Sequence, residues 1–171
     1  MAYSLRPVTR ADLAMLGRWL TTTEVARWWG DPVEQFNLLL EDLGNPDMVM
    51  RIVSYHGTPF AYCQHYDVHR WPQPHLALLP VGSRAIDNFI GEPAMIGFGH
   101  GSTFLWLLTK LLRAQGAPII AVDPAVANTR ARRAYQKAGF ADHSVIATSD
   151  GPVVLMLCSR TGNHRGWQPA D

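Results

Sequence analysis

The feature that most constrains this chain is a glycine-rich turn that joins a strand to a helix. Gly97, Gly99 and Gly101 follow a strand candidate at 83–90 and precede the apolar run 104–114. Glycines let backbone N–H groups converge on one point, and the start of a helix adds partial positive charge. Together these features suit phosphate binding. A turn without a ligand explains the glycines equally well.

Two familiar phosphate motifs do not fit this turn. A P-loop requires Gly-Lys-Ser/Thr, and residues 100–102 read His-Gly-Ser. The dinucleotide fingerprint G-x-G-x-x-G places its third glycine one residue later than Gly101. Asp123 stands where a ribose-binding acid would be, but it ends a strand before a proline. Neither of these nucleotide-binding classes is therefore indicated.

The order of elements around the turn indicates an α+β (mixed α/β) fold. Helices are expected after Thr9, with Asp12 in the first turn, and over 32–43, 104–114 and 128–137. Residues 67–80 are expected to be a loop, because their prolines exclude regular structure. Strands are expected at 3–8, 48–54, 60–66, 83–90, 118–122, 140–147 and 153–159. A chain of 171 residues fits one domain, expected over 1–160, with a flexible tail at 161–171.

Charge and cysteine content exclude several classes of protein. Fifteen Lys and Arg balance fourteen Asp and Glu, so no strong nucleic-acid footprint is expected. No stretch is long and apolar enough for a membrane span or a signal peptide, and the two distant cysteines suggest buried, reduced thiols. We therefore expect a cytoplasmic protein. The seven histidines have loose spacing with no cluster of cysteines or acids, so no metal is expected.

Two motifs about 25 residues apart resemble those of the GNAT superfamily of N-acetyltransferases. The first is Ile96-Gly97-Phe98-Gly99-His100-Gly101-Ser102. The second comprises Asp123-Pro124, Asn128, Arg130-Ala131, Tyr135 and Lys137-Ala138-Gly139-Phe140. The resemblance covers nearly the whole chain, with Leu5-Arg6-Pro7-Val8-Thr9 as a common opening. It implies acetyl-CoA as co-substrate and a central mixed sheet, flanked by helices and splayed between two middle strands.

Within that superfamily the chain resembles the aminoglycoside 6′-N-acetyltransferases. The residues that carry this are Trp28-Trp29-Gly30, Ala61-Tyr62-Cys63-Gln64 with Tyr66, Arg84-Ala85-Ile86-Asp87-Asn88 and Thr148-Ser149-Asp150-Gly151-Pro152. The resemblance implies transfer to a primary amine of a small molecule, a role in antibiotic resistance, and a monomer or homodimer. Acetyltransferases of hydroxylysine-type siderophore precursors share much of the pattern. A catalytically idle CoA-binding module is a third reading.

The resemblance gives two residues catalytic roles. Asp87 stands at the position of the proposed general base, and an otherwise apolar strand favours a functional acid there over a structural partner of Arg84. Tyr135 resembles the tyrosine that donates a proton to the departing thiolate. A core tyrosine on an amphipathic helix is the alternative for Tyr135.

The resemblance also assigns cofactor contacts. Asn128 is expected to hydrogen-bond the pantetheine amides, and Lys137 to meet a CoA phosphate, although helix lysines usually face solvent. A strand N–H near Phe89 is expected to polarise the acetyl carbonyl. The pyrophosphate is expected to lie against the backbone of Phe98, Gly99, His100, Gly101, Ser102 and Thr103, with hydroxyls from the last two.

The acceptor pocket is expected to be aromatic. Its candidates are Trp28, Trp29, Gln64, Tyr66, Trp71 and Asp123. At least one of the adjacent tryptophans is expected to be core, and Asp123 is equally explained as a turn residue. The related aminoglycoside enzymes carry acids just before the Arg-x-Ile-Asp strand, whereas residues 71–80 have none. Since polycations bind largely through charge complementarity, this points toward a less charged amine.

Overall fold

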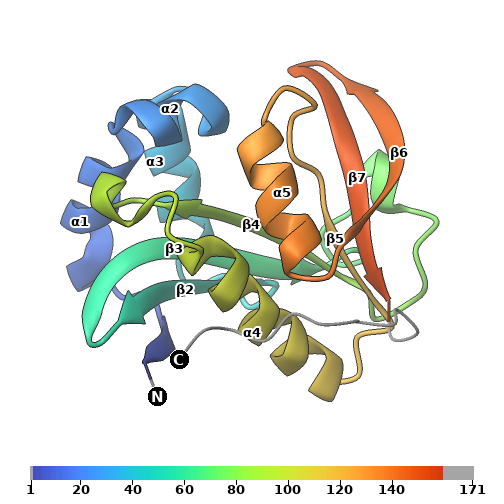
Figure 1. The fold of residues 1–171 in the computed structure, drawn as a ribbon, viewed down its shortest axis with the longest axis horizontal. Helices are drawn as coiled ribbons and strands as arrows, with labels where there is room; N and C mark the ends of the chain where they lie inside the picture. Colours follow the sequence, from blue (N-terminus) through green and yellow to red (C-terminus); the bar gives the residue numbers. More distant parts are fainter. Residues whose placement is uncertain (1, 160–171) are drawn as a thin grey trace. The chain divides into compact units, whose positions relative to one another are not determined.

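The computed structural model describes residues 2–159, which form two compact units (Figure 1). The first unit comprises the chain up to Tyr66 together with Asp87–Phe98, and the second comprises Asp67–Ile86 and the described residues from Gly99 onward. The single domain expected over 1–160 would contain both units and stays a prediction. The tail expected at 161–171 lies outside the described residues.

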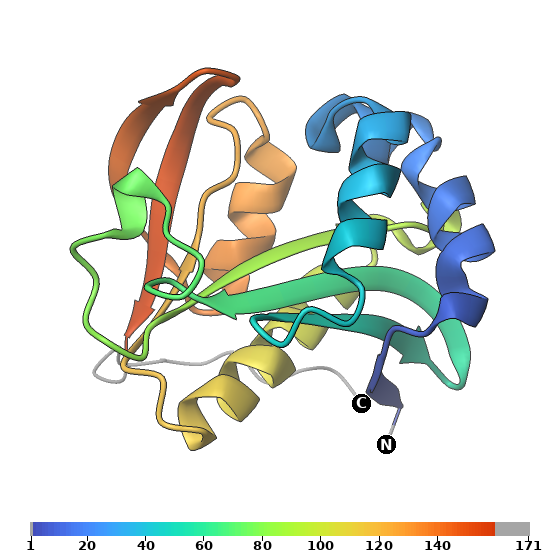
Figure 2. The same cartoon turned by 180° about the vertical axis from the view of Figure 1, so that it is seen from behind.

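The first unit is built on an antiparallel meander with three helices. Tyr3 pairs with Tyr55, and Met48 pairs with Tyr66, so the first strand adjoins the second and the second adjoins the third. Figure 2 shows α1 and α3 side by side, and these two helices contact each other. The elements are β1 (Tyr3–Pro7), α1 (Leu13–Leu20), α2 (Thr23–Trp29), α3 (Pro32–Asp42), β2 (Met48–Tyr55) and β3 (Thr58–Asp67).

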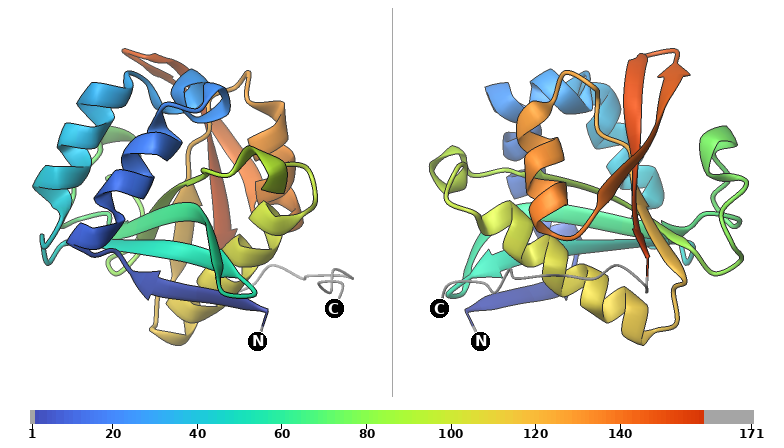
Figure 3. Two further views of the ribbon diagram at one scale, coloured as in Figure 1. Left: turned by 90° about the vertical axis from the view of Figure 1, so that its left-hand side faces the viewer. Right: turned by 45° about the vertical axis from the view of Figure 1, so that its right-hand side comes forward.

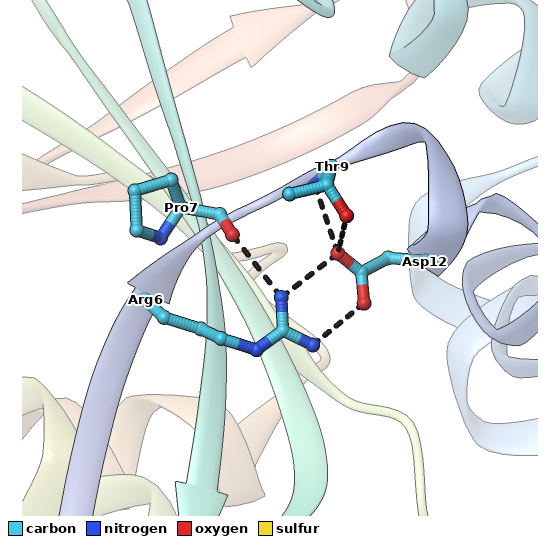
Figure 4. Close-up of polar contacts among 4 residues, drawn as sticks. All are labelled: Arg6, Pro7, Thr9 and Asp12. Atoms are coloured by element: carbon cyan, nitrogen blue, oxygen red, sulfur yellow. Dashed lines mark hydrogen bonds and ion pairs between the residues drawn. The ribbon is translucent and has the colours of Figure 1, made fainter.

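The carboxylate of Asp12 fixes the entry into α1 (Figure 4). It accepts two hydrogen bonds from the Arg6 guanidinium, at 2.8 and 2.6 Å, and two from the backbone N–H and hydroxyl of Thr9, at 2.8 and 2.9 Å. The Arg6 hydrogen bond, together with those from Thr9, holds the pKa of Asp12 well below its ordinary value, against the opposing effect of burial. The capping arrangement expected from Thr9 and Asp12 is confirmed, inside a 3₁₀ turn over Arg10–Asp12 that precedes α1.

Gly91 is required where the chain leaves β4 (Arg84–Ile90). A Cβ atom at this position would lie 2.1 Å from Cδ2 of Trp19, which is 2% exposed. The indole N–H of Trp19 donates to Glu92 at 2.7 Å, so the ring has little freedom to move aside. The N–H of Gly91 donates to the carbonyl of Phe60 at 2.8 Å.

The second unit combines parallel and antiparallel strand pairing. Arg84 pairs in parallel with Ile120, and Ile119 pairs in antiparallel register with Ser159. The hairpin of β6 and β7 closes where Thr148 meets Gly151, and the right panel of Figure 3 shows the two strands twisting about each other. The further elements are α4 (His100–Ala114), β5 (Ile119–Val122), α5 (Thr129–Lys137), β6 (Ala141–Thr148) and β7 (Gly151–Ser159).

The sheet as a whole has seven strands in the order β1-β2-β3-β4-β5-β7-β6. β4 passes from one unit to the other, with residues 84–86 in the second unit and residues 87–90 in the first. The apolar side of α4 is fully buried through residues at helical spacing, namely Phe104, Leu105, Leu108 and Leu112. The expected α+β fold class with a mixed sheet is confirmed.

Three details differ from the expectation. Helix α2 was not expected, because its β-branched and aromatic residues have only modest helix propensity. Helix α4 begins at His100, so the residues at 100–103 form its first turn and not a loop. The proline-rich loop contains a 3₁₀ turn over Pro74–Leu76, which starts at a proline as helices often do.

Candidate active site

In the first unit, Asp87 is held by a chain of hydrogen bonds. The amide nitrogen of Gln64 on β3 donates to Oδ2 of Asp87 on β4 at 2.9 Å. The hydroxyl of Tyr62, two residues earlier on β3, donates to the amide oxygen of Gln64 at 2.6 Å. Arg84, the alternative partner for Asp87, donates instead to the carboxylate of Asp67. The alternative of an ion pair between Asp87 and Arg84 is therefore not supported.

Aromatic rings pack around Tyr62, at one end of this series of hydrogen bonds. Tyr62 is 0% exposed and stacks on Phe89, with ring centroids 5.2 Å apart. Trp29 meets Tyr62 and Phe89 edge to face at 5.9 and 4.7 Å, and its indole N–H donates to the carbonyl of Asn88. Trp28 lies half-buried with the Arg27 guanidinium 4.8 Å over its ring. Trp29 is thus the one of the adjacent tryptophans that packs against the core.

Burial keeps the phenol and the thiol beside Gln64 neutral. Burial, followed by the negative charge of Asp87, raises the pKa of Tyr62 far above its ordinary value. Burial raises the pKa of the Cys63 thiol to about 12, so this cysteine is a neutral core residue and not a nucleophile. Tyr66, the other expected acceptor residue on β3, is 7% exposed.

In the second unit, Asp123 has a partner that the sequence did not reveal. A ring nitrogen of His75 lies 2.8 Å from Oδ2 of Asp123. The side chain of His75 is 13% exposed and that of Asp123 is 35% exposed, so the pair is partly accessible to solvent. His75 belongs to the 3₁₀ turn in the proline-rich loop, and Asp123 directly follows β5. Trp71 lies half-buried in the same loop, and its backbone N–H donates to the carbonyl of Asp67.

The glycine turn leads into the N-terminus of α4. Gly97 and Gly99 have positive φ angles of 92° and 86°, which favour glycine. No acidic residue stands in the first turn of α4, so no carboxylate of that turn offsets the positive end of the helix dipole. Phe98 beside them is 76% exposed, and Gly101 is half-buried. The fifteen-residue helix therefore begins at a point suited to an anion.

Two hydroxyl side chains in the first turn of α4 form hydrogen bonds within the chain. The hydroxyls of Ser102 and Thr103 both donate to the carbonyl of Gly99, at 2.9 and 3.1 Å. The expected role of these hydroxyls as ligand donors is therefore not supported, while the backbone role of both residues stays a prediction. Burial lowers the pKa of His100, so its neutral form is favoured and the ring adds little positive charge.

Helix α5 places the remaining candidates. The side chain of Asn128 accepts a hydrogen bond from the N–H of Ala131 at 3.1 Å and so caps the helix. Tyr135 is 8% exposed and meets Phe140 edge to face at 5.7 Å. Lys137 is exposed at the last turn. The cofactor roles expected for these residues stay predictions.

Neither a cluster of metal-ligating side chains nor a helix able to span a bilayer is found among residues 2–159. In this part of the chain no group of three or more His, Cys, Asp or Glu is placed to hold a metal ion. None of the helices described there combines the length and the apolar character that a bilayer span requires.

Comparison with known proteins identifies the family. The family model of the GNAT acetyltransferase domain matches residues 8–148. The aminoglycoside N(6′)-acetyltransferase type 1 of Klebsiella pneumoniae is 31% identical over 176 residues, which cover 95% of this chain and 85% of that protein. The protein of the same name from Serratia marcescens matches equally well.

Solved structures give the same result at the level of the fold. A structure of AAC(6′)-Ib in complex with paromomycin and acetyl-CoA has a TM-score of 0.83 at 30% identity and covers 99% of this chain and 100% of that one. A complex of AAC(6′)-Ib with coenzyme A and kanamycin has a TM-score of 0.81 at 31% identity, over 94% and 96% of the two chains. The chain therefore belongs to the GNAT family of acetyltransferases and is related to the aminoglycoside N(6′)-acetyltransferases.

Proposed function

We propose that this protein is an acetyl-CoA-dependent N-acetyltransferase that acts on a primary amine of an aminoglycoside-like small molecule. The observation that carries the proposal is the 31% identity to aminoglycoside N(6′)-acetyltransferases over 95% of the chain. Its relatives have been solved in complex with acetyl-CoA and paromomycin and with coenzyme A and kanamycin. The acid-free start of α4 fits a phosphate-bearing co-substrate.

In the proposed reaction, Asp87 removes a proton from the ammonium group of the acceptor, directly or through water. The neutral amine then attacks the thioester carbonyl, the C–N bond forms, and the C–S bond breaks. Tyr135 gives a proton to the departing thiolate and regains one, through water, as the attacking nitrogen loses its second proton. Asp87 then releases the proton that it took to the solvent. The N–H groups of Gly99, Gly101 and their neighbours would hold the pyrophosphate, Asn128 and Lys137 would contact the rest of CoA, and the N–H near Phe89 would polarise the carbonyl.

A less cationic acceptor is the second candidate. Residues 71–80 contain no acidic residue, and Asp123 is paired with a histidine that opposes its charge when protonated. These two observations favour a second candidate acceptor, a small amine with one or two positive charges. Trp28 and Trp71, both half-buried, would offer aromatic surface to either acceptor.

Thiol release from acetyl-CoA tests the proposal directly. The acceptor panel would contain kanamycin, ribostamycin, a diamine and hydroxylysine, each assayed over a range of concentrations. The proposal predicts turnover with an aminoglycoside at kcat/KM of at least about 10⁴ M⁻¹s⁻¹. Turnover confined to the smaller amines would establish the second candidate, and binding of acetyl-CoA without transfer to any amine would refute both.

We also propose a cytoplasmic location and a monomeric or homodimeric state. Both cysteines of the chain, Cys63 and Cys158, are buried and unpaired, as is usual in a reducing compartment. Cell fractionation tests the location. Light scattering coupled to size exclusion tests the oligomeric state, since a mass above that of a dimer would contradict the proposal.

A further inference from the structure

We propose that Tyr62 and Gln64 form a positioning relay that orients Asp87 for proton removal. This inference rests on the proposed function and changes the role of Gln64, which the sequence placed among the acceptor-binding residues. The relay consists of two hydrogen bonds in series, from the Tyr62 hydroxyl to the Gln64 amide oxygen at 2.6 Å and from the Gln64 amide nitrogen to Oδ2 of Asp87 at 2.9 Å.

The chemistry of the end groups fixes the direction of both bonds. An ionised carboxylate only accepts hydrogen bonds, so the amide nitrogen of Gln64 must face Asp87. The amide oxygen must then face Tyr62, which has to be a donor. A neutral phenol meets that requirement, and the burial of Tyr62 keeps it neutral. A flipped amide would set oxygen against oxygen at Asp87, so the relay has one stable arrangement.

The first member of the relay is rigid. Tyr62 and Gln64 stand at positions i and i+2 of β3 and therefore point to the same face of the strand. The Tyr62 ring is 0% exposed and is fixed by Phe89 and Trp29. Gln64 is only half-buried and would have several rotamers on its own. The phenol selects one of them, and this rotamer carries the amide N–H to Asp87.

The relay suits a base that must meet a cation. A lysine or arginine in place of Gln64 would stabilise the carboxylate but would also repel an ammonium group. An amide stabilises the charge by hydrogen bonding alone and leaves the net charge of the site unchanged. Because proton transfer requires heavy atoms within hydrogen-bond distance, loss of orientation lowers kcat more than it weakens binding.

A double-mutant cycle tests the relay on the full-length protein. Tyr62→Phe keeps the ring and removes the hydroxyl, and Gln64→Leu keeps most of the volume and removes the amide. We expect kcat to fall about 5-fold in the first variant and about 50-fold in the second, with KM for acetyl-CoA within twofold of wild type. The double variant should be no slower than Gln64→Leu, because Tyr62 acts through Gln64.

Tyr3→Phe is the matched control. Tyr3 lies on β1 and packs against Tyr55 and Phe60, so its substitution changes a tyrosine of the same unit outside the relay. We expect wild-type kcat in this variant. Fully multiplicative losses in the double variant would overturn the relay. A rise in KM for the amine with kcat unchanged would also overturn it, because Gln64 would then be an acceptor contact.

A titration separates failure of the relay from failure of the proposed function. The carboxyl carbon of Asp87 can be followed by ¹³C NMR in wild type and in Gln64→Leu, with Asp87→Asn for assignment. The relay predicts that the titration midpoint moves up by about one pH unit when the amide is removed, a tenfold change. An unmoved midpoint would refute the relay even in an active enzyme, and a moved midpoint would support it even if no amine were acetylated.

Discussion

Asp87 lies within a strand of the first unit, and Asp123 directly follows a strand of the second unit. Their hydrogen-bond partners differ in kind. Asp87 accepts a hydrogen bond from the amide of Gln64, whereas Asp123 faces the imidazole of His75. An amide is uncharged at every pH, while an imidazole gains a proton close to neutrality in most proteins. The amide can therefore orient a carboxylate without cancelling its charge, and the imidazole can cancel it.

A third carboxylate completes the comparison. Asp12 is buried and bound twice by the permanently charged Arg6, and it also accepts two hydrogen bonds from Thr9. These four hydrogen bonds join β1 to the start of α1, and they occupy both oxygens of the carboxylate. The three carboxylates thus have partners of three kinds: a fixed cation for Asp12, a neutral amide for Asp87 and an imidazole for Asp123. The predictions below test whether these partners separate a structural acid, the proposed base and the proposed acceptor contact.

The largest effect is expected at Asp87. Asp87→Asn removes the base but keeps the shape, so kcat should fall about 10²- to 10³-fold while the Kd of acetyl-CoA stays near wild type. A thiol-release assay would measure kcat, and calorimetric titration would measure the Kd of acetyl-CoA. Asp142→Asn is the control, because Asp142 is a surface carboxylate paired with Arg132 and should leave kcat unchanged. Equal loss of turnover and of acetyl-CoA binding would mean that Asp87 is structural.

The next largest effect is on stability. Asp12→Asn should lower the free energy of unfolding by about 2 kcal/mol at pH 7, since it weakens charge-assisted hydrogen bonds to a partly exposed arginine. The pKa of Asp12 is lowered by folding, so its contribution is complete above its ordinary pKa of 3.8, declines below that value and is lost as the pH falls through the lowered pKa of the folded protein. Denaturant melts should therefore show the two proteins converging in acid, with kcat per folded molecule unchanged. A constant difference at all pH values would contradict this account.

A smaller effect is expected at Asp123. Asp123→Asn should raise KM for a polycationic acceptor about tenfold and leave kcat within twofold, because a charge that attracts the acceptor contributes to binding alone. Initial-rate kinetics with kanamycin and with a monoamine would measure it, and the monoamine should be affected least. A fall in kcat of the size expected for Asp87 would give Asp123 a catalytic role and remove the contrast between the two acids.

The smallest effect is expected at His75. His75→Gln gives Asp123 a neutral amide partner, as Asp87 has, and should lower KM for kanamycin about threefold near neutral pH. The same assay applies, with His143→Gln as a control at an exposed position on β6. An increase in KM would show that the imidazole supports the acceptor instead of opposing it.

Local patterns in the sequence predicted much of the fold. The glycine turn, the strand before it, the apolar body of α4 and the cap at Thr9 all depend on residues within a few positions of one another. Steric limits on φ and ψ and the period of apolar residues act at that range, so one sequence is enough to detect them. Helix α2 was not predicted because its residues have no strong preference for the helical conformation, so packing decides whether this segment is helical.

The sequence by itself determined the strand that carries Asp87 and the helix that carries Tyr135. Only the tertiary structure decided which partner each carboxylate has. Gln64 lies 23 residues from Asp87 and His75 lies 48 residues from Asp123, so each pairing depends on which strands and turns become neighbours. No local rule encodes that choice, because it follows from the burial of the whole sheet and from the register of its strands.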